Sequence, residues 1–267
     1  MQQSEKLISA GDILLDVLSA GAGPDLVLLH GMGSTARSFN PITEKLAERY
    51  RVTAWNAPGY GRSANISKEK PTADDYARVL GSLFEQVGIE RCVLAGHSLG
   101  ALVGAAFAVA FPEKVRGIVL ADPGRGFGLG PDDPWPEPVA KRNADLADLG
   151  PAGYAARRAP LLCAPDASEE SIAAVEREMA RISPEGLARA SWLLSQAWID
   201  DALHALTCPV LVMGGEFDRV TPIDDVRLLS EIAPGAKFVT LTGVGHAGYV
   251  EDPEQYRGAI ESFIGSL

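Results

Sequence analysis

The amino-acid sequence predicts an α/β fold with a mostly parallel, doubly wound central sheet and an all-helical insertion. Over the first 120 residues, short β-branched runs alternate with segments of helical spacing, which is typical of βαβ units. After Asp122 this alternation stops, and it resumes near residue 209. We therefore expect an α/β core formed by residues 1–122 and 208–267, with a helical cap at residues 123–207.

The strands expected in the first half differ in how they are buried. Residues 13–17 alternate and indicate an antiparallel edge hairpin, whereas residues 25–30 and 115–121 are continuous apolar runs typical of buried strands. A further strand is expected at 52–55, after a helix at 41–50.

Helical spacing marks the remaining elements. Residues 72–87 place apolar side chains three and four positions apart, and Gly88 ends this helix. The insertion contains amphipathic runs at 169–182 and 184–198. After it we expect, in order, a strand at 209–213, a helix from Pro222, a strand at 237–241 and a helix at 253–264.

The composition excludes several classes of partner. A net charge of -11 argues against nucleic acid or an anionic membrane surface, because both require clustered cations. No stretch approaches the roughly 18 apolar residues of a membrane span, and no leader pattern begins the chain, so a cytoplasmic protein is expected. The three cysteines lack metal-ligand spacing. We expect a small-molecule substrate and neither a cofactor nor a metal, and the sequence leaves a homodimer open.

The sequence Gly-His-Ser-Leu-Gly at residues 96–100 carries the clearest chemical signal. It lies between an apolar strand run at 92–95 and an apolar helical run at 101–111. A serine on such a sharp strand-to-helix turn exposes its hydroxyl, and the flanking glycines allow strand and helix to cross closely. We interpret Ser98 as a nucleophile at the N-terminus of a helix.

A serine nucleophile needs a base, and His246 is the strongest of the four histidines. It lies in a glycine-rich loop directly after the last predicted strand, where it could reach Ser98. His204 belongs to the insertion, and we expect it on a helix surface or in packing. His97 adjoins Ser98 but should point away from the hydroxyl, and His30 ends a strand and should brace a loop.

The acid that orients the base is expected to be Asp218. It precedes a helix start that we place with Thr221 as the N-cap and Pro222 at the first helical position. Asp122, at the end of the strand before the insertion, is a rival because a carboxylate there could also reach the histidine. Glu216 is a weaker alternative.

Two backbone N–H groups are expected to stabilise the oxyanion. One belongs to Leu99, which follows the nucleophile, and we assign the other to Met32 in the loop after the strand at residues 25–30. If Met32 only lines the pocket, Gly33 or Ser34 would donate instead.

The insertion holds three of the four tryptophans, which are Trp135, Trp192 and Trp198. They either form an aromatic roof over the substrate or make up the core of the insertion's own helices. Arg125 is the cation best placed to meet a substrate carboxylate, and Arg37 is a weaker candidate.

Five motifs in order resemble the α/β-hydrolase fold family in its capped branch. They are His-Gly-Met-Gly at 30–33, Asn-Ala-Pro-Gly-Tyr-Gly-Arg-Ser at 56–63, the serine turn at 96–100, Gly-Glu-Phe-Asp-Arg-Val-Thr-Pro at 215–222 and Gly-His at 245–246. Serine at the turn departs from the aspartate pattern of dehalogenases and epoxide hydrolases in that family.

The resemblance implies an esterase, an enol-lactone hydrolase or a hydrolase of carbon–carbon bonds. From the residues we expect an ester or lactone to be cleaved through an acyl-enzyme by Ser98, His246 and Asp218. The alternatives are cleavage of a vinylogous diketone, a receptor with slow turnover, and lyase chemistry on the same fold.

Overall fold

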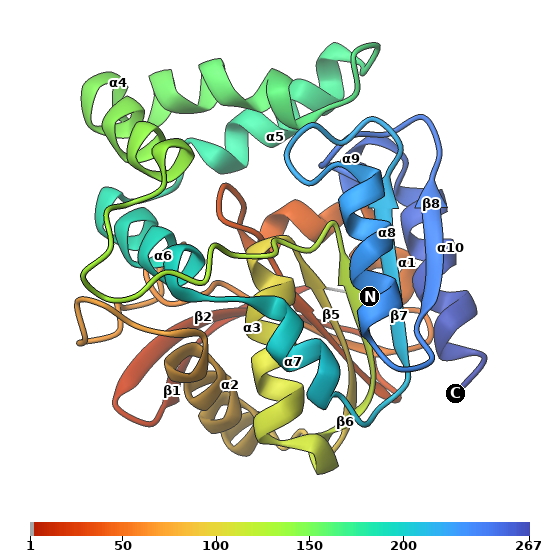
Figure 1. Cartoon of the computed structure of the whole chain (residues 1–267). Coiled ribbons are helices and arrows are strands. Elements are labelled where there is room, and N and C mark those ends of the chain that lie inside the picture. The colour runs from red at the N-terminus through yellow and green to blue at the C-terminus, as the bar shows by residue number, and fades with distance from the viewer. Residues whose placement is uncertain (1–2) are drawn as a thin grey trace.

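A twisted sheet forms the centre of the computed structural model, which describes residues 3–267 (Figure 1). The sheet order is β1-β2-β4-β3-β5-β6-β7-β8. The antiparallel pairs are β1 with β2 and β2 with β4, and the pairs from β4 through β8 are parallel. The strands are β1 (Ser4–Ala10), β2 (Ile13–Ala20), β3 (Asp25–Leu29), β4 (Arg51–Trp55), β5 (Cys92–His97), β6 (Val115–Ala121), β7 (Val210–Gly215) and β8 (Lys237–Leu241). The predicted mostly parallel sheet with an antiparallel edge hairpin is confirmed.

Helices cover both faces of this sheet. Outside the insertion they are α1 (Asn40–Leu46), α2 (Ala73–Val87), α3 (Leu99–Ala110), α8 (Ile223–Ile232), α9 (Gly248–Glu251) and α10 (Pro253–Ile264). On β6, Ile118 faces Gly104 of α3, while the preceding Gly117 faces Phe263 of α10. Because successive strand residues point to opposite faces, α3 and α10 lie on opposite sides of the sheet. This is the doubly wound arrangement that the sequence predicts.

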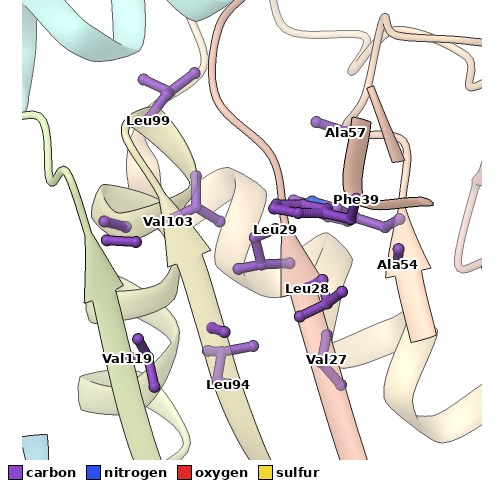
Figure 2. Packing of buried hydrophobic residues seen from close by; sticks show 14 of the residues in the cluster. Val27, Leu28, Leu29, Phe39, Ala54, Ala57, Leu94, Leu99, Val103 and Val119 are labelled. Carbon is purple, nitrogen blue, oxygen red and sulfur yellow. The ribbon is translucent and has the colours of Figure 1, made fainter. Parts of the chain in front are cut away.

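The core consists of apolar side chains from the central strands and from the helices packed on them. Leu28 of β3, Leu94 of β5 and Val119 of β6 are each at most 1% exposed, and Figure 2 shows them on three adjacent strands with Val103 of α3 close by. A Cβ at Gly104 would meet Leu94 and Ile118 at 3.4 and 3.6 Å. These are ordinary van der Waals distances, so α3 packs directly on the side chains of β5 and β6 at this position.

The segment between β6 and β7 contains helices and no regular strand among the described residues. The helices are α4 (Glu137–Leu162), α5 (Glu169–Met179), α6 (Pro184–Gln196) and α7 (Ile199–Ala205). Figure 1 shows α4 and α5 lying across one end of the α/β core. The backbone of α4 breaks at Gly150, which has φ 66° and ψ 172° and is followed by Pro151. Within residues 3–267, none of the helices is long and apolar enough to cross a membrane.

Candidate active site

The loops that follow five strands meet at the end of the sheet under α4 and α5. Met32 follows β3, Ser98 follows β5, Asp122 follows β6, Asp218 follows β7 and His246 follows β8. These strands are parallel, so their carboxyl ends lie at one edge. Ligand sites of open α/β sheets form at this edge.

Ser98 occupies a strained turn between β5 and α3. Its φ is 54° and its ψ is -115°, a conformation that non-glycine residues rarely adopt. A Cβ at Gly96 would lie 2.3 Å from the Gly100 carbonyl oxygen, and one at Gly100 would lie 2.2 Å from the Leu29 oxygen. The Ser98 N–H donates to the Ala121 oxygen of β6 at 2.9 Å. These contacts give the strand–turn–helix geometry that the glycine spacing predicts.

His246 and Asp218 form a short hydrogen bond, with His246 Nδ1 and Asp218 Oδ2 separated by 2.6 Å. Asp218 also accepts the backbone N–H groups of Val220 and Thr221 on Oδ1, and the Thr221 hydroxyl on Oδ2 at 2.6 Å. Burial alone would raise the pKa of Asp218, but the charge of His246 and these hydrogen bonds outweigh burial and hold the pKa well below its ordinary value. Asp218 therefore stays ionised and fixes the imidazole ring.

The predicted role of Thr221 as a helix N-cap is wrong. The helix α8 begins at Ile223, and Pro222 occupies the N-cap position. The reason is that both the N–H and the hydroxyl of Thr221 bind the carboxylate of Asp218. The threonine thus supports the acid instead of the helix.

Asp122 lies next to this pair in a fully buried position. Its Oδ1 accepts the Gly215 N–H at 2.8 Å, and its Oδ2 has no hydrogen-bond partner among residues 3–267. Burial, reinforced by the negative charge of Asp218, raises the pKa of Asp122 well above its ordinary value. A neutral Asp122 is a poor partner for an imidazolium, so the geometry favours Asp218 over Asp122 as the acid.

Asp122, Asp218 and His246 each offer one possible metal-ligand atom, and these atoms lie within 4.8 Å of one another. Their chemistry does not suit a cation. Asp218 and the Nδ1 atom of His246 already bind each other, and the raised pKa of Asp122 favours its uncharged form. Two other histidines lie outside this cluster. His204 is exposed in α7, which agrees with the expected helix-surface position. His97 donates from Nε2 to the His246 carbonyl oxygen at 2.8 Å. His97 thereby holds the His246 loop.

His30 braces two loops as a neutral imidazole. Its Nδ1–H donates to the Gly31 oxygen at 2.8 Å, and its Nε2 accepts the Ala57 N–H at 3.0 Å. Burial lowers the pKa of His30 to about 4, against a smaller raising effect of the Gly31 bond. A protonated ring would direct a second N–H at the Ala57 N–H, so protonation opposes this arrangement.

The contribution of His30 to stability is expected to decrease as the pH falls from 6.5 towards 4. In this window the unfolded chain takes up the proton and the folded chain does not, so acid favours unfolding by at most about 1.4 kcal/mol per pH unit. The stability difference between the wild type and His30→Gln should therefore shrink in chemical denaturation between pH 7.5 and pH 5. A difference that stays constant over this range would contradict the assignment.

A cavity of about 670 Å³ lies between the strand-end loops and the insertion. Ser98, His246, Met32 and Leu99 all line it. Within residues 3–267, the Ser98 hydroxyl makes no hydrogen bond to His246, although both groups face the same space. Such contacts often tighten only when substrate is bound.

The backbone N–H groups of Met32 and Leu99 remain available for a substrate oxygen. In the described part of the chain neither N–H donates a hydrogen bond, and Leu99 begins α3, whose N-terminus favours negative charge. The Tyr60 hydroxyl donates to the Met32 carbonyl oxygen at 2.7 Å and fixes this loop.

The three tryptophans of the insertion do not form a roof over the cavity. Trp135, Trp192 and Trp198 are absent from its lining in the region that the structure describes. Trp192 is buried and packs against Trp135 with ring centroids 6.3 Å apart, while Trp198 is 39% exposed. Of the two alternatives left open by the sequence, the position of Trp192 supports packing within the insertion.

Arg125 lines the cavity, but its charge is already compensated. Its guanidinium donates to both carboxylate oxygens of Asp200, at 3.0 and 2.5 Å, and lies 4.4 Å from the ring centroid of Trp198. Arg37 forms an ion pair with Glu5 and does not line the cavity. Neither arginine is free to neutralise a substrate anion without giving up its partner.

Sequence reasoning missed Arg142 and Arg158, two arginines of α4 that line the cavity. A signal for Arg142 exists in the sequence. It lies three residues after Val139 and four before Leu146, both of which are buried, so a cation occupies the apolar face of this helix.

Comparisons with known proteins show the family of this chain. The sequence model of the alpha/beta hydrolase family matches residues 26–259. The chain belongs to the alpha/beta hydrolase family. Over 255 residues this alpha/beta hydrolase is 30% identical to the pimeloyl-[acyl-carrier protein] methyl ester esterase of Aeromonas hydrophila subsp. hydrophila, covering 92% of this chain and 97% of the relative.

Solved structures extend the likeness of this alpha/beta hydrolase to the whole fold. A thermophilic esterase from Thermogutta terrifontis, solved with malate bound, has a TM-score of 0.86 and 26% identity, covering 100% of this chain and 99% of that chain. The enol-lactonase from Burkholderia xenovorans LB400 has a TM-score of 0.87 and 20% identity, covering 98% and 100%. At this identity the enol-lactonase shows the fold alone.

Proposed function

We propose that this alpha/beta hydrolase cleaves an ester, a lactone or a related activated carbonyl compound through an acyl-enzyme. The observation that carries the proposal is the short His246–Asp218 hydrogen bond beside a cavity that Ser98 also lines. A serine hydroxyl becomes nucleophilic when a neighbouring histidine, held in one tautomer by a carboxylate, accepts its proton.

The mechanism has two acyl-transfer steps. The Ser98 oxygen attacks the carbonyl carbon as His246 takes the hydroxyl proton, and the Met32 and Leu99 N–H groups bind the resulting oxyanion. The tetrahedral intermediate collapses, the bond to the leaving group breaks, and His246 returns the proton to that group. Water then attacks the acyl-enzyme with His246 as the base, which releases the acid and restores Ser98.

The relatives support an ester bond as the target. The Aeromonas hydrophila protein is named for hydrolysis of a methyl ester, and the Thermogutta terrifontis protein is described as an esterase. Both likenesses extend over nine-tenths or more of this chain. The ionised, ring-orienting Asp218 fits this chemistry, because acyl transfer requires a histidine that alternates between base and acid.

Turnover of a short p-nitrophenyl ester in water enriched in oxygen-18 tests the reaction type. We expect a rapid phase of p-nitrophenol release, an acyl mass increase on the peptide that contains Ser98, and one solvent oxygen in the released acid. Acid without solvent oxygen would contradict hydrolysis and favour lyase chemistry. A stable acyl adduct, formed with release of one equivalent of p-nitrophenol and followed by no further turnover, would indicate a receptor.

The bond that is cleaved best is found by comparing kcat/KM for esters, lactones and vinylogous diketones. Reactivity towards p-nitrophenyl esters alone does not identify it, because activated esters react readily in such sites. A diketone with the highest kcat/KM would contradict the proposed ester or lactone substrate and favour carbon–carbon bond hydrolysis.

A further inference from the structure

The cavity is lined by cations although the whole protein is strongly acidic. Four arginines line it, and Asp225 is the one acidic residue among its lining within residues 3–267. The net charge of the chain is -11. Positive charge is therefore concentrated where the substrate of the proposed hydrolase must bind, which favours an anion there.

Two of these arginines donate hydrogen bonds to oxygen atoms of the protein. Arg125 is paired with Asp200, as described above. Arg219 donates from Nη2 to the carbonyl oxygens of Pro160 and Cys163, at 2.9 and 3.0 Å. These contacts within the protein therefore explain the positions of Arg125 and Arg219.

Arg142 and Arg158 have no such partner. In the part of the chain that the structure describes, neither forms an ion pair with a carboxylate. The titratable groups that act on Arg142 are Arg158, Tyr154 and Tyr60. Arg142 Nη1 lies 2.8 Å from the thioether sulfur of Met32, which is a weak acceptor.

Burial makes this arrangement costly without an anion. Arg142 is half-buried, and burial together with the nearby Arg158 lowers the pKa of its guanidinium. A guanidinium nevertheless keeps its charge in proteins, so a buried one needs a counter-charge to offset lost hydration. Two neighbouring cations present the paired donors that bind a carboxylate well.

We propose that Arg142 and Arg158 bind a carboxylate carried by the substrate, remote from the bond that is cleaved. The substrate class is then an ester or lactone whose acyl chain ends in a second, ionised carboxyl group. This inference rests on the proposed hydrolase function. Because Arg142 contacts Met32, whose N–H is assigned to the oxyanion, the carboxylate site adjoins the Met32 side of the cavity.

Matched pairs of esters test the substrate class. Mono-p-nitrophenyl adipate and p-nitrophenyl hexanoate have six-carbon acyl chains that differ in whether the far end is a carboxylate or a methyl group, and suberate and octanoate form a second pair. For at least one chain length, we expect the wild type to favour the carboxylate ester about 10- to 100-fold in kcat/KM, the size of one or two charge-assisted hydrogen bonds.

Arg142→Met and Arg158→Met should each reduce this preference by at least about tenfold, because each removes one donor group. The neighbouring Arg157 provides a matched control, since it is exposed and pairs with Asp145 outside the cavity. Arg157→Gln should keep the wild-type preference. If Arg142→Met fails to fold, Arg158→Met alone decides the result.

If the wild type showed a kcat/KM ratio of about one for both ester pairs, the carboxylate site would be overturned. A preference that survives both methionine substitutions would overturn it as well. Absence of turnover of all four esters would instead contradict the proposed hydrolase function. Thermal unfolding distinguishes failure of the carboxylate site from failure of the hydrolase function, because ligand binding does not depend on catalysis. Millimolar suberate should raise the Tm of the wild type and of Arg157→Gln, and should not raise that of Arg142→Met; equal shifts in all three would overturn the site.

Discussion

Replacing Ser98 with alanine should lower kcat for a short p-nitrophenyl ester by a factor on the order of 10⁶. The substitution removes the oxygen that would form the acyl-enzyme in the proposed mechanism, so only binding and the oxyanion donors would remain to accelerate attack by water. Steady-state kinetics with purified protein measures the change, and intact-protein mass spectrometry should show no acyl adduct.

The same substitution should leave the fold intact. Alanine keeps the Cβ atom of Ser98 and adds no atom to the turn, and the Ser98 backbone N–H still reaches the Ala121 oxygen. The free energy of unfolding measured in urea should therefore change by no more than about 0.5 kcal/mol. Full esterase turnover by a correctly folded Ser98→Ala protein would refute the assignment of the nucleophile.

Replacing Asp218 with asparagine should lower kcat roughly 10⁴-fold. The present carboxylate accepts the His246 Nδ1–H at 2.6 Å, whereas an amide NH₂ in its place would favour the tautomer that has its proton on Nε2. That tautomer cannot accept the Ser98 proton. The loss should appear mainly in kcat, since Asp218 is not among the residues that line the cavity in the described chain.

Asp122→Asn serves as the matched control for this prediction. Asp122 has a raised pKa, and an asparagine can keep its one hydrogen bond, which it accepts from the Gly215 N–H. We expect its effect on kcat to be about tenfold or smaller, comparable to loss of one neutral hydrogen bond. If Asp122→Asn were the more damaging of the two substitutions, the acid role would belong to Asp122.

The relative positions of the candidate site residues could be predicted because they follow strands of a parallel sheet. Ser98, Asp218 and His246 lie far apart in the sequence, but each comes directly after an apolar run that forms a strand. Carboxyl ends of parallel strands share one edge, so the sheet brings these residues together. The glycines around Ser98 could also be predicted from the local backbone, since a Cβ at Gly96 or Gly100 would overlap backbone atoms.

The chemistry of the insertion could not be predicted in the same way. Its helices have several apolar faces, and periodicity does not say which face meets the core and which meets the cavity. Arg125 is placed near the cavity as expected, but its pairing with Asp200 depends on how α7 packs. The Thr221 error has a similar origin, because a carboxylate competes with the helix for the same hydroxyl.

The break in α4 affects which substrates the proposed carboxylate site can accommodate. Arg142 precedes Gly150 and Arg158 follows it, so the two cations lie on the two helical segments that the break separates. Pro151 begins the second segment, where its missing N–H costs no helical hydrogen bond and its fixed φ suits a helix start. The angle between the two segments therefore sets the distance between the two guanidinium groups, and with it the length of diacid that the proposed site fits best.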